Sequence, residues 1–407
     1  MSKLFVFTNA FPYGYREPYL ESEVEYYKSF NAVTVISLQI KSNEKSVLRK
    51  IPGNIKVLPV FFASKYIYIF NTISTLRDKN LYIEFFKLLK TKRLGVKSLV
   101  KLFVFFSRAH YEANIIKSKL SKKDFDDSVF YIYRFDYQPY VALLLRDYFN
   151  IHNRIYSRAH GYDLYEYRHP FDYIPMREFL LKNLYKVFPC SEDGTRYLKK
   201  NYSEYKDKIC TKYLGTQDHG IQVYKEKEYF HIISCSNVVS IKRLDLIIKA
   251  LSRINLHKIK WTHFGDGDLM KDIVSQAINL PENIIVDFKG NIDNIDLLKN
   301  YEQNYYDLFI NVSSTEGIPV SIMEAMSFGI PCLATNAGGT AEIVQNDVSG
   351  KIIPIDVSAD EIACTIEFFI CMDKKEYLIM RKNARRLWNE KFNAARNYRS
   401  FIEAIRL

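Results

Sequence analysis

Long hydrophobic runs are missing from this sequence of 407 residues. Apolar runs such as LFVFF at residues 102–106 are far shorter than the roughly 20 apolar residues that cross a bilayer as a helix. The apolar stretch near the N-terminus is also short and is followed by proline and charge, unlike a secretory signal peptide. We therefore expect a cytoplasmic protein, with at most a peripheral association with the inner face of the plasma membrane.

Cysteine is sparse and shows no recognisable spacing. The eight histidines are dispersed, and no acidic triad suited to a divalent cation is visible. The sequence thus predicts reduced core thiols, with no disulfide framework and no metal site. The six cysteines are Cys190, Cys210, Cys235, Cys332, Cys364 and Cys371.

The composition is that of a globular protein with more than one domain. Hydrophobic residues make up 48% of the chain and charged residues 26%, and the length exceeds what one compact core usually holds. A strand–helix–strand pattern opens the chain, and a second series begins at residues 231–236 (HIISCS). We expect an α/β protein with a domain boundary in the polar stretch 216–228.

Acidic residues are scarce in one long segment. Between Lys41 and Phe125, 19 Lys and Arg stand against 5 Asp and Glu, whereas the whole chain has 58 and 46. Residues 82–93 and 96–108 alternate aromatic and basic side chains, which predicts helices with one apolar and one basic aspect, suited to an anionic membrane surface. Core-facing helices with a solvated basic face explain the pattern equally well. No nucleic-acid recognition motif accompanies the net charge of +12, so no nucleic-acid partner is expected.

The most informative stretch is TEGIPVSIMEAMSFGIPC at residues 315–332. An apolar run at 307–312 predicts a buried strand before it, and a helix is expected to open at Pro319 and stop near Gly329. A second strand at 331–335, a glycine loop and a helix near Ala341 should follow. Two helix N-termini would then lie at the carboxyl edge of a parallel sheet, where N–H groups attract phosphate. The glycines of these loops, Gly317, Gly338 and Gly339, let the backbone approach a ligand closely.

Three side chains near such loops are candidates for contacts with a sugar nucleotide. Glu316 lies in the loop and Glu324 more than one turn into the helix, and carboxylates accept hydrogen bonds from sugar hydroxyls well. The alternative is that both are helix-start and surface acids. His160, in the polar loop RAHGYD after an apparent strand, is a candidate donor or acceptor, and a packed or solvated ring is the alternative.

These motifs resemble those of the retaining glycosyltransferases of family 4, the glycosyl transferases group 1. Residues 316–331 are similar to that family's EGxPxxxxEAMxxGxP signature. SCSNVVSIKRLDLIIKAL (234–251) places Lys242 at the family's lysine position, and HFGDGDL (263–269) matches another landmark. Segments 8–24, 157–170 and 187–198 are similar to bacterial members, and 388–401 looks like the terminal crossover helix.

The resemblance implies a GT-B fold, in which two Rossmann-like doubly wound domains face a central cleft. Residues 1–220 would form the acceptor-side domain, with a C-terminal helix at 389–407 packing back on it, and 221–388 the donor domain. The implied activity is transfer of a sugar, with retention, from a nucleotide-diphosphate sugar to a hydroxyl of a glycan or lipid-linked saccharide. The implied pathway is bacterial O-antigen, capsule or exopolysaccharide synthesis, with no cofactor and no metal.

The resemblance also implies roles for individual residues. Glu316 would orient the donor sugar, Lys242 would bind the diphosphate, and His160 would contact the reacting groups. Glu324 would bind ribose. Asn237 occupies a position where family members commonly have arginine, and the first loop has a single glycine, Gly14, where many members have two. The remaining residues assigned to the nucleotide sugar are Gly317, Ile318, Pro319, Val320, Arg243, Gly265, Gly338 and Gly339.

Three other functions remain open at this stage. A sugar-nucleotide epimerase of the same architecture is the nearest enzymatic alternative. A catalytically silent nucleotide-sugar-binding subunit is favoured by Asn237 alone. A nucleic-acid binder is favoured only by the positive charge. Release of nucleoside diphosphate on addition of an acceptor would separate the transferase from all three.

Overall fold

The chain folds into two compact units. The computed structural model describes residues 3–62, 64, 66, 71–223, 225 and 227–406. Unit 1 comprises Met1–Lys212 and Tyr398–Leu407, and unit 2 comprises Tyr213–Asn397. The chain thus passes between the units twice. Lys65, one base of the segment 41–125, lies outside the described residues.

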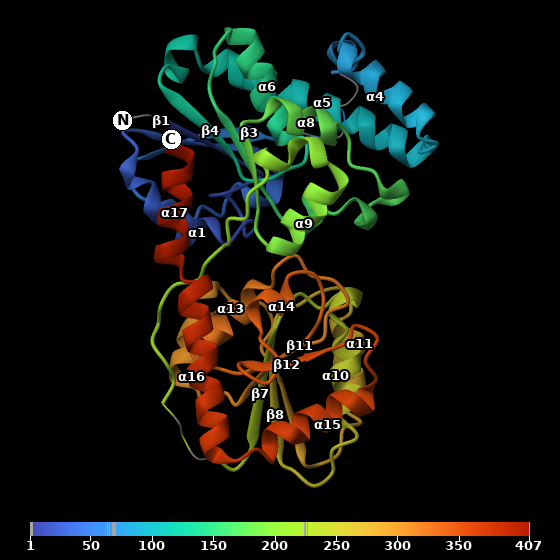
Figure 1. Ribbon diagram of the computed structural model, residues 1–407, viewed down its shortest axis with the longest axis vertical. Coiled ribbons are helices and arrows are strands. Elements are labelled where there is room, and N and C mark those ends of the chain that lie inside the picture. The colour runs from blue at the N-terminus through green and yellow to red at the C-terminus, as the bar shows by residue number, and fades with distance from the viewer. Residues whose placement is uncertain are drawn as a thin grey trace. The chain divides into compact units, whose positions relative to one another are not determined.

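Unit 1 is built on a six-stranded sheet in the order β3-β2-β1-β4-β5-β6, with every pairing parallel. Both faces of the central strand are buried: Leu4 and Val6 enter one core, and Phe5 and Phe7 the other. This explains the unbroken apolar run of that strand, because helices cover a parallel sheet on both sides (Figure 1). The strands are β1 (Lys3–Thr8), β2 (Val33–Ile40), β3 (Ile55–Phe61), β4 (Ser128–Ile132), β5 (Ile155–Ala159) and β6 (Lys186–Pro189).

The helices of unit 1 connect and cover these strands. Two of them begin at a side-chain cap. The Asp78 carboxylate accepts a hydrogen bond from the N–H of Asn80, and the Ser191 hydroxyl accepts one from the N–H of Gly194. The α-helices are α1 (Leu20–Glu23), α3 (Thr72–Leu76), α4 (Lys79–Lys90), α5 (Val96–Lys119), α6 (Gln138–Phe149), α7 (Gly161–Leu164), α8 (Arg177–Asn183) and α9 (Glu192–Asn201). The 3-10 turns are η1 (Val24–Ser29), η2 (Ser42–Glu44), η3 (Lys122–Phe125), η4 (Glu166–Arg168), η5 (Pro170–Asp172) and η6 (Ser203–Lys208).

Unit 2 repeats the same topology, with a parallel sheet in the order β12-β11-β10-β7-β8-β9. Ile232, Leu308 and Leu333, from three adjacent strands, share one core with the fully buried Trp261. The strands are β7 (Phe230–Cys235), β8 (Ile259–Phe264), β9 (Ile284–Phe288), β10 (Leu308–Asn311), β11 (Cys332–Thr335) and β12 (Gly350–Ile353). The helices are η7 (Ser240–Lys242), α10 (Leu244–Leu251), α11 (Met270–Ala277), α12 (Asn294–Gln303), α13 (Val320–Ser327), α14 (Thr340–Ile343), α15 (Ala359–Ile370) and α16 (Lys374–Lys391).

The last helix, α17 (Ala394–Arg406), joins the two units in sequence. Phe401, Ile402 and Ile405 are buried in the same core as Leu4 and Val6, against the sheet of unit 1 (Figure 1). The expected single helix over 389–407 is divided, because α16 ends at Lys391 and Asn393 caps a new helix by accepting from the N–H of Ala395 at 3.0 Å.

Each sheet reverses its strand order at one point, between β1 and β4 in unit 1 and between β7 and β10 in unit 2. At such a switch point the loops after the two central strands diverge and leave a crevice outside their carboxyl ends. The topology therefore predicts a ligand site at each of these two positions. Within the described residues, no helix combines the length and apolar character needed to cross a membrane.

Two details of the motif at 315–341 differ from expectation. Pro319 is the N-cap rather than the first helical residue, since its carbonyl accepts from the N–H of Ile322 at 3.2 Å. The helix expected near Ala341 begins at Thr340 and has only four residues, so its dipole is weak. Gly329 follows the end of α13 with a φ of +73°, as expected of a helix-terminating glycine.

Candidate active site at the carboxyl edge of the second sheet

Lys242 and Glu316 meet at the switch point of unit 2. Lys242 closes the turn between β7 and α10, and Glu316 lies in the loop between β10 and α13. Lys242 Nζ lies 2.6 Å from Glu316 Oε1, which also accepts from Asn311 Nδ2 at 3.2 Å. Both side chains are shielded, with 21% and 11% exposed. A cation and a carboxylate thus stand next to the N-terminus of α13, where N–H groups favour anions.

The loop that carries Glu316 is fixed by the glycine loop after β11. The N–H of Gly339 donates to Gly317 O at 2.8 Å. Gly338 has a φ of +54°, and a Cβ there would lie 2.1 Å from Glu316 O. The two glycines predicted to approach a ligand therefore approach the Glu316–Gly317 backbone, and through it they hold the position of Glu316.

Glu324 lies inside unit 2, not on its surface. Only 7% of the residue is exposed, and its Oε1 accepts from Asn294 Nδ2, at the start of α12, at 2.8 Å. Burial raises the pKa of this carboxyl to about 7, against a smaller lowering by the Asn294 hydrogen bond. A carboxyl poised between its two forms can accept or donate hydrogen bonds to ribose hydroxyls. The surface-acid alternative is wrong for this residue.

The other predicted residues of unit 2 differ in what they contact. Asn237 is exposed in the loop after β7. The guanidinium of Arg243 donates to Val312 O and Ile355 O, both at 2.6 Å, so it braces neighbouring loops. Gly265 has a φ of +135°, and a Cβ there would lie 1.9 Å from Ser236 O. These contacts explain, without a ligand, why residue 243 is an arginine and residue 265 a glycine.

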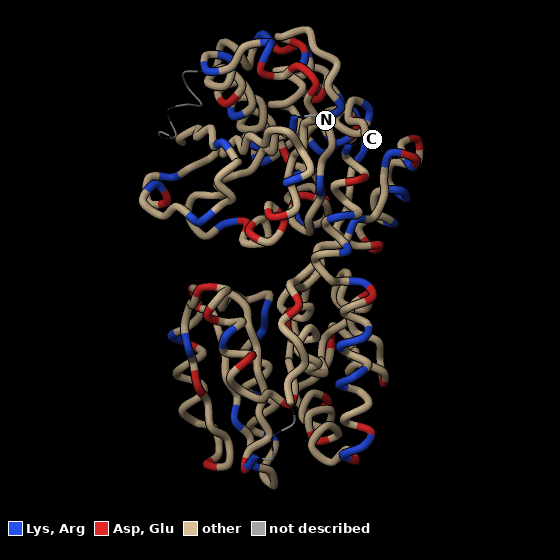
Figure 2. Tube along the Cα trace, turned by 90° about the vertical axis from the view of Figure 1, so that its left-hand side faces the viewer, with Lys and Arg blue, Asp and Glu red and all other residues tan. Residues whose placement is uncertain are grey.

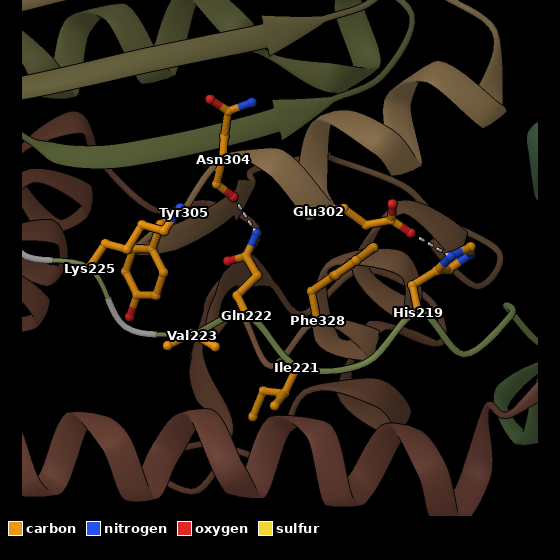
Figure 3. Close-up of a pocket in the computed structure, with 9 residues that line it drawn as sticks. All are labelled: His219, Ile221, Gln222, Val223, Lys225, Glu302, Asn304, Tyr305 and Phe328. Carbon is orange, nitrogen blue, oxygen red and sulfur yellow. Dashed lines mark hydrogen bonds and ion pairs between the residues drawn. The ribbon is translucent and has the colours of Figure 1, made fainter.

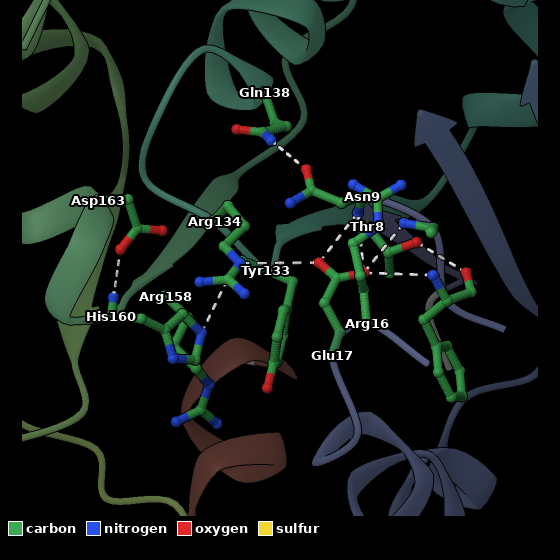
Figure 4. Close-up of polar contacts among 12 residues, drawn as sticks. Thr8, Asn9, Arg16, Glu17, Tyr133, Arg134, Gln138, Arg158, His160 and Asp163 are labelled. Atoms are coloured by element: carbon green, nitrogen blue, oxygen red, sulfur yellow. Dashed lines mark hydrogen bonds and ion pairs between the residues drawn. The ribbon is translucent and has the colours of Figure 1, made fainter. Parts of the chain in front are cut away.

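In unit 1 the first loop is organised around a side chain not assigned from sequence, Glu17. Its carboxylate accepts from the N–H groups of Asn9, Ala10 and Phe11 at 3.0–3.2 Å, at the carboxyl end of β1 (Figure 4). An internal carboxylate thus occupies backbone donors of the kind that bind anions. Gly14 donates its N–H to Val47 O at 2.9 Å, and a Cβ at Gly14 would lie 2.8 Å from Glu44 Cγ.

His160 has both ring nitrogens engaged by the protein. Nε2 lies 3.0 Å from Tyr133 O (Figure 4), and Nδ1 lies 3.5 Å from Cys190 Sγ. A carbonyl can only accept, which assigns the proton to Nε2. Burial, together with Arg134 and Arg158, lowers the pKa of His160 well below its usual value, so the ring is neutral. The structure thus gives His160 the contacts of a packed loop residue next to Asp163.

Sequence reasoning missed the two asparagines that hold the glutamates. Asn311 is the one polar residue of β10 and was visible as a break in an apolar run; Asn294 carries no local signal. Across the described ranges, no group of three or more His, Cys, Asp or Glu side chains is arranged to hold a metal ion.

A separate cavity of about 230 Å³ lies at the amino edge of the same sheet. It is formed by residues that precede β10 and follow α13, together with the segment after the unit boundary (Figure 3). Its position separates it from Lys242 and Glu316, which follow the carboxyl ends of their strands. Its lining comprises His219, Ile221, Gln222, Val223, Lys225, Glu302, Asn304, Tyr305 and Phe328.

Two Rossmann-like units, one with a lysine–glutamate pair at its switch point, define a GT-B protein. The fold is shared with a glycosyltransferase from Rickettsia africae, at a TM-score of 0.68 and 17% identity over 99% of this chain and 97% of the other. Residues 217–387 match the family described as Glycosyl transferases group 1. The similarity to this family therefore lies in the second unit.

Curated relatives match the chain over a shorter span. Protein CapJ of Staphylococcus aureus is 35% identical over 125 residues, which cover 30% of this chain and 31% of that protein. An Escherichia coli UDP-Gal:alpha-D-GlcNAc-diphosphoundecaprenol alpha-1,3-galactosyltransferase is 32% identical over 125 residues, or 30% of each chain. These matches thus span about a third of the relatives' length.

Proposed function

We propose that the protein transfers a sugar from a nucleotide-diphosphate sugar to a hydroxyl of a glycan or lipid-linked saccharide, with retention, in the synthesis of a bacterial surface polysaccharide. Unit 2 would bind the donor and unit 1 the acceptor. The observation that carries the proposal is the pair of Lys242 and Glu316 beside the N-terminus of α13, within the family-matched segment. The reaction named for the similar Escherichia coli galactosyltransferase supports the reaction class.

The pair suggests how the site responds to a donor. The diphosphate carries more negative charge than Glu316 and would draw the Lys242 ammonium away from it. Glu316, still held by Asn311, would then be released to accept hydrogen bonds from donor sugar hydroxyls. As the anomeric carbon–oxygen bond breaks, Lys242 and the α13 N–H groups stabilise the leaving diphosphate. The acceptor oxygen forms the new bond, and its proton goes to the departing phosphate.

The first test measures donor binding and turnover with matched lysine variants. A panel of nucleotide sugars is screened by thermal stabilisation, and release of nucleoside diphosphate is followed with acceptor present. Lys242→Ala should reduce turnover at least tenfold. Lys249→Ala is the control, because Lys249 is 59% exposed and pairs only locally, with Asp245. Equal losses in the two variants would contradict the assignment. Nucleotide-sugar binding without any transfer would favour the silent subunit.

We further propose that unit 1 docks on an anionic membrane to reach a lipid-linked acceptor. The helices α4 and α5 leave large apolar side chains exposed beside bases. Figure 1 shows α4 at the periphery of unit 1. Figure 2 marks both kinds of charge along the chain. The exposed apolar residues are Tyr82, Ile83, Phe86, Leu89, Val96, Leu99 and Val100, and the exposed bases are Lys90, Lys92, Arg93 and Lys97.

This arrangement favours the membrane over a merely solvated basic face. On α4 it is Glu84 and Leu88 that are buried, while Ile83 and Phe86 are 62% and 64% exposed. A helix whose only task is to cover a core would turn these apolar side chains inward. Apolar residues that enter the headgroup region, flanked by Lys and Arg, are the pattern of interfacial helices.

Sedimentation with lipid vesicles tests this proposal. Binding should require anionic lipid and fall as salt rises. Because each base near an anionic surface contributes about 1 kcal/mol, replacing Lys90, Lys92, Arg93 and Lys97 by Gln should weaken binding roughly a hundredfold or more. Four exposed bases of unit 2, Lys271, Lys375, Lys382 and Lys391, provide the control set. Equal binding by both quadruple variants, or none by the parent at low salt, would refute docking.

A further inference from the structure

Arg134, in the loop after β4, has a guanidinium that the protein leaves largely unsatisfied. Within the described part of the chain it makes no hydrogen bond, and its Nε is enclosed without a partner. Asp163 and Glu17 both stabilise its charge, and Glu17 Oε1 lies 3.8 Å from Nε; 28% of the side chain is exposed (Figure 4). Because part of the side chain is exposed and the guanidinium makes none of the hydrogen bonds that arginine donors in such surroundings normally make, its remaining N–H groups are available to a ligand.

Glu17 is a poor partner for this cation because the protein already uses its oxygens. Oε1 accepts from the N–H of Asn9, and Oε2 accepts from the N–H groups of Asn9, Ala10 and Phe11. Those bonds hold the carboxylate against the backbone of the first loop. It cannot turn to form the two parallel bonds that a guanidinium makes with a free carboxylate or phosphate.

Two buried arginines of this unit donate to fixed partners. Arg158 donates to Tyr131 Oη at 2.9 Å and faces Glu23 Oε2 at 3.3 Å. Arg177 has a buried Nε without a partner, as Arg134 has, but its two terminal nitrogens donate to Phe135 O at 2.9 Å and to Asp163 O at 2.5 Å. Within the described residues, the terminal nitrogens of Arg134 have no such structural acceptors.

A second unsatisfied group lies four residues after Arg134 in the chain. Gln138, the first residue of α6, donates from Nε2 to Asn9 Oδ1, and its Oε1 is buried without a partner. Figure 4 shows Gln138 and Arg134 on the same side of Asn9. A charged donor and a neutral acceptor together suit a group that carries both a negative charge and a hydroxyl.

The position of this pair in the sheet points to a ligand as well. Asn9 and Glu17 belong to the loop after β1, and Arg134 to the loop after β4. The strand order of unit 1 reverses between these two strands. The unsatisfied groups therefore lie where a doubly wound sheet binds its ligands.

We propose that Arg134, assisted by Gln138, forms an anion-binding site in unit 1, and that the acceptor carries a phosphate or carboxylate group bound there. The assignment to the acceptor rests on the proposed function. Unit 2 already supplies Lys242 and the α13 N-terminus for the donor diphosphate, so a second cationic site in the other unit serves a second anion. Arginine is the residue best suited to bind such a group with two parallel bonds.

Direct anion binding tests the site without requiring an active enzyme. Pyrophosphate and glucuronate are titrated separately, by calorimetry, into the full chain carrying Lys242→Ala, which disables the donor site. Adding Arg134→Gln should weaken binding roughly tenfold to a hundredfold, and Arg134→Lys should restore part of it. Arg196→Gln is the control, since Arg196 is 69% exposed on α9. Comparing the two anions identifies the chemical group.

The possible results separate this inference from the proposed function. Anion binding that Arg134→Gln removes and Arg196→Gln preserves supports the site, whether or not sugar transfer is found. If Lys242→Ala protein binds neither anion, or binds one equally with and without Arg134→Gln, the site is refuted even when transfer occurs. With an active enzyme, Arg134→Gln should raise the KM for acceptor and leave the KM for donor unchanged.

Discussion

Replacing Glu324 by Gln should stabilise unit 2 at neutral and alkaline pH. Gln has nearly the same shape as Glu, and its carbonyl oxygen can still accept the hydrogen bond from Asn294. Unlike the carboxyl group of Glu, the amide group of Gln does not ionise. The parent must keep an ionised carboxylate at a position where only 7% of the residue is exposed, and the variant does not.

The magnitude follows from the pKa of this carboxyl. Burial raises it from 4.5 to about 7 in the folded protein. Since each pKa unit corresponds to about 1.36 kcal/mol, the parent should be less stable than Glu324→Gln by about 3 kcal/mol at alkaline pH. The folded state binds the proton more tightly than the unfolded state. The parent's stability is therefore intact below pH 4.5 and is lost progressively as pH rises through 7.

Tryptophan fluorescence can follow unit 2 alone. The chain has two tryptophans, Trp261 and Trp388, and both are buried in that unit. Urea unfolding of parent and variant is measured from acid to mildly alkaline pH, and the difference in free energy of unfolding is plotted. Asp163, whose pKa burial raises to about 6, lies in unit 1 and is present in both proteins, so its effect cancels. A difference that stays constant with pH, or grows toward acid, would refute the reasoning.

Three further results are expected. Gly338→Ala places a Cβ 2.1 Å from Glu316 O. It should displace the loop that carries Glu316 and weaken nucleoside diphosphate binding about tenfold or more. Unchanged binding in titrations would show that the loop adapts. Phe401→Ala should destabilise unit 1 by about 3–5 kcal/mol and leave the unfolding of unit 2, followed by tryptophan fluorescence, unchanged. Circular dichroism, compared with fluorescence, reports the loss in unit 1. A shift seen only in fluorescence would contradict the packing of α17 on unit 1. Asn294→Ala removes a hydrogen bond that lowers the pKa of Glu324. The midpoint of the pH-dependent loss of stability should therefore move above pH 7. A move to lower pH would exclude Asn294 as the hydrogen-bond partner of Glu324.

The sequence predicted the local elements of unit 2 better than the contacts of its side chains. The α/β class followed from the apolar runs, and the end of α13 from Gly329, because strand burial and helix termination are local. Local patterns cannot predict that Lys242 and Glu316 meet, because the two residues are 74 positions apart in sequence. They come together because β7 pairs with β10. That pairing is a property of the whole sheet, and the family resemblance implied only that each domain is doubly wound.

Sequence patterns do not reveal contacts between side chains that are distant in sequence. Asn294, the partner of Glu324, comes from a different helix, so neither this hydrogen bond nor the burial of Glu324 was expected. Arg243 follows Lys242 in a basic pair, and its guanidinium donates to two carbonyls on other loops. In unit 1, Glu17 and Arg134 carry no motif, and they became visible only when the loops after β1 and β4 were seen together.

The position of α17 sets the order in which the protein can be completed during synthesis. Residues 213–397 contain everything that unit 2 needs, whereas the core of unit 1 stays open until Phe401, Ile402 and Ile405 have left the ribosome. The unit that is made first is therefore finished last. Until then it exposes the apolar face around Leu4 and Val6, so premature termination after residue 397 would release a folded unit 2 attached to an incomplete, aggregation-prone unit 1.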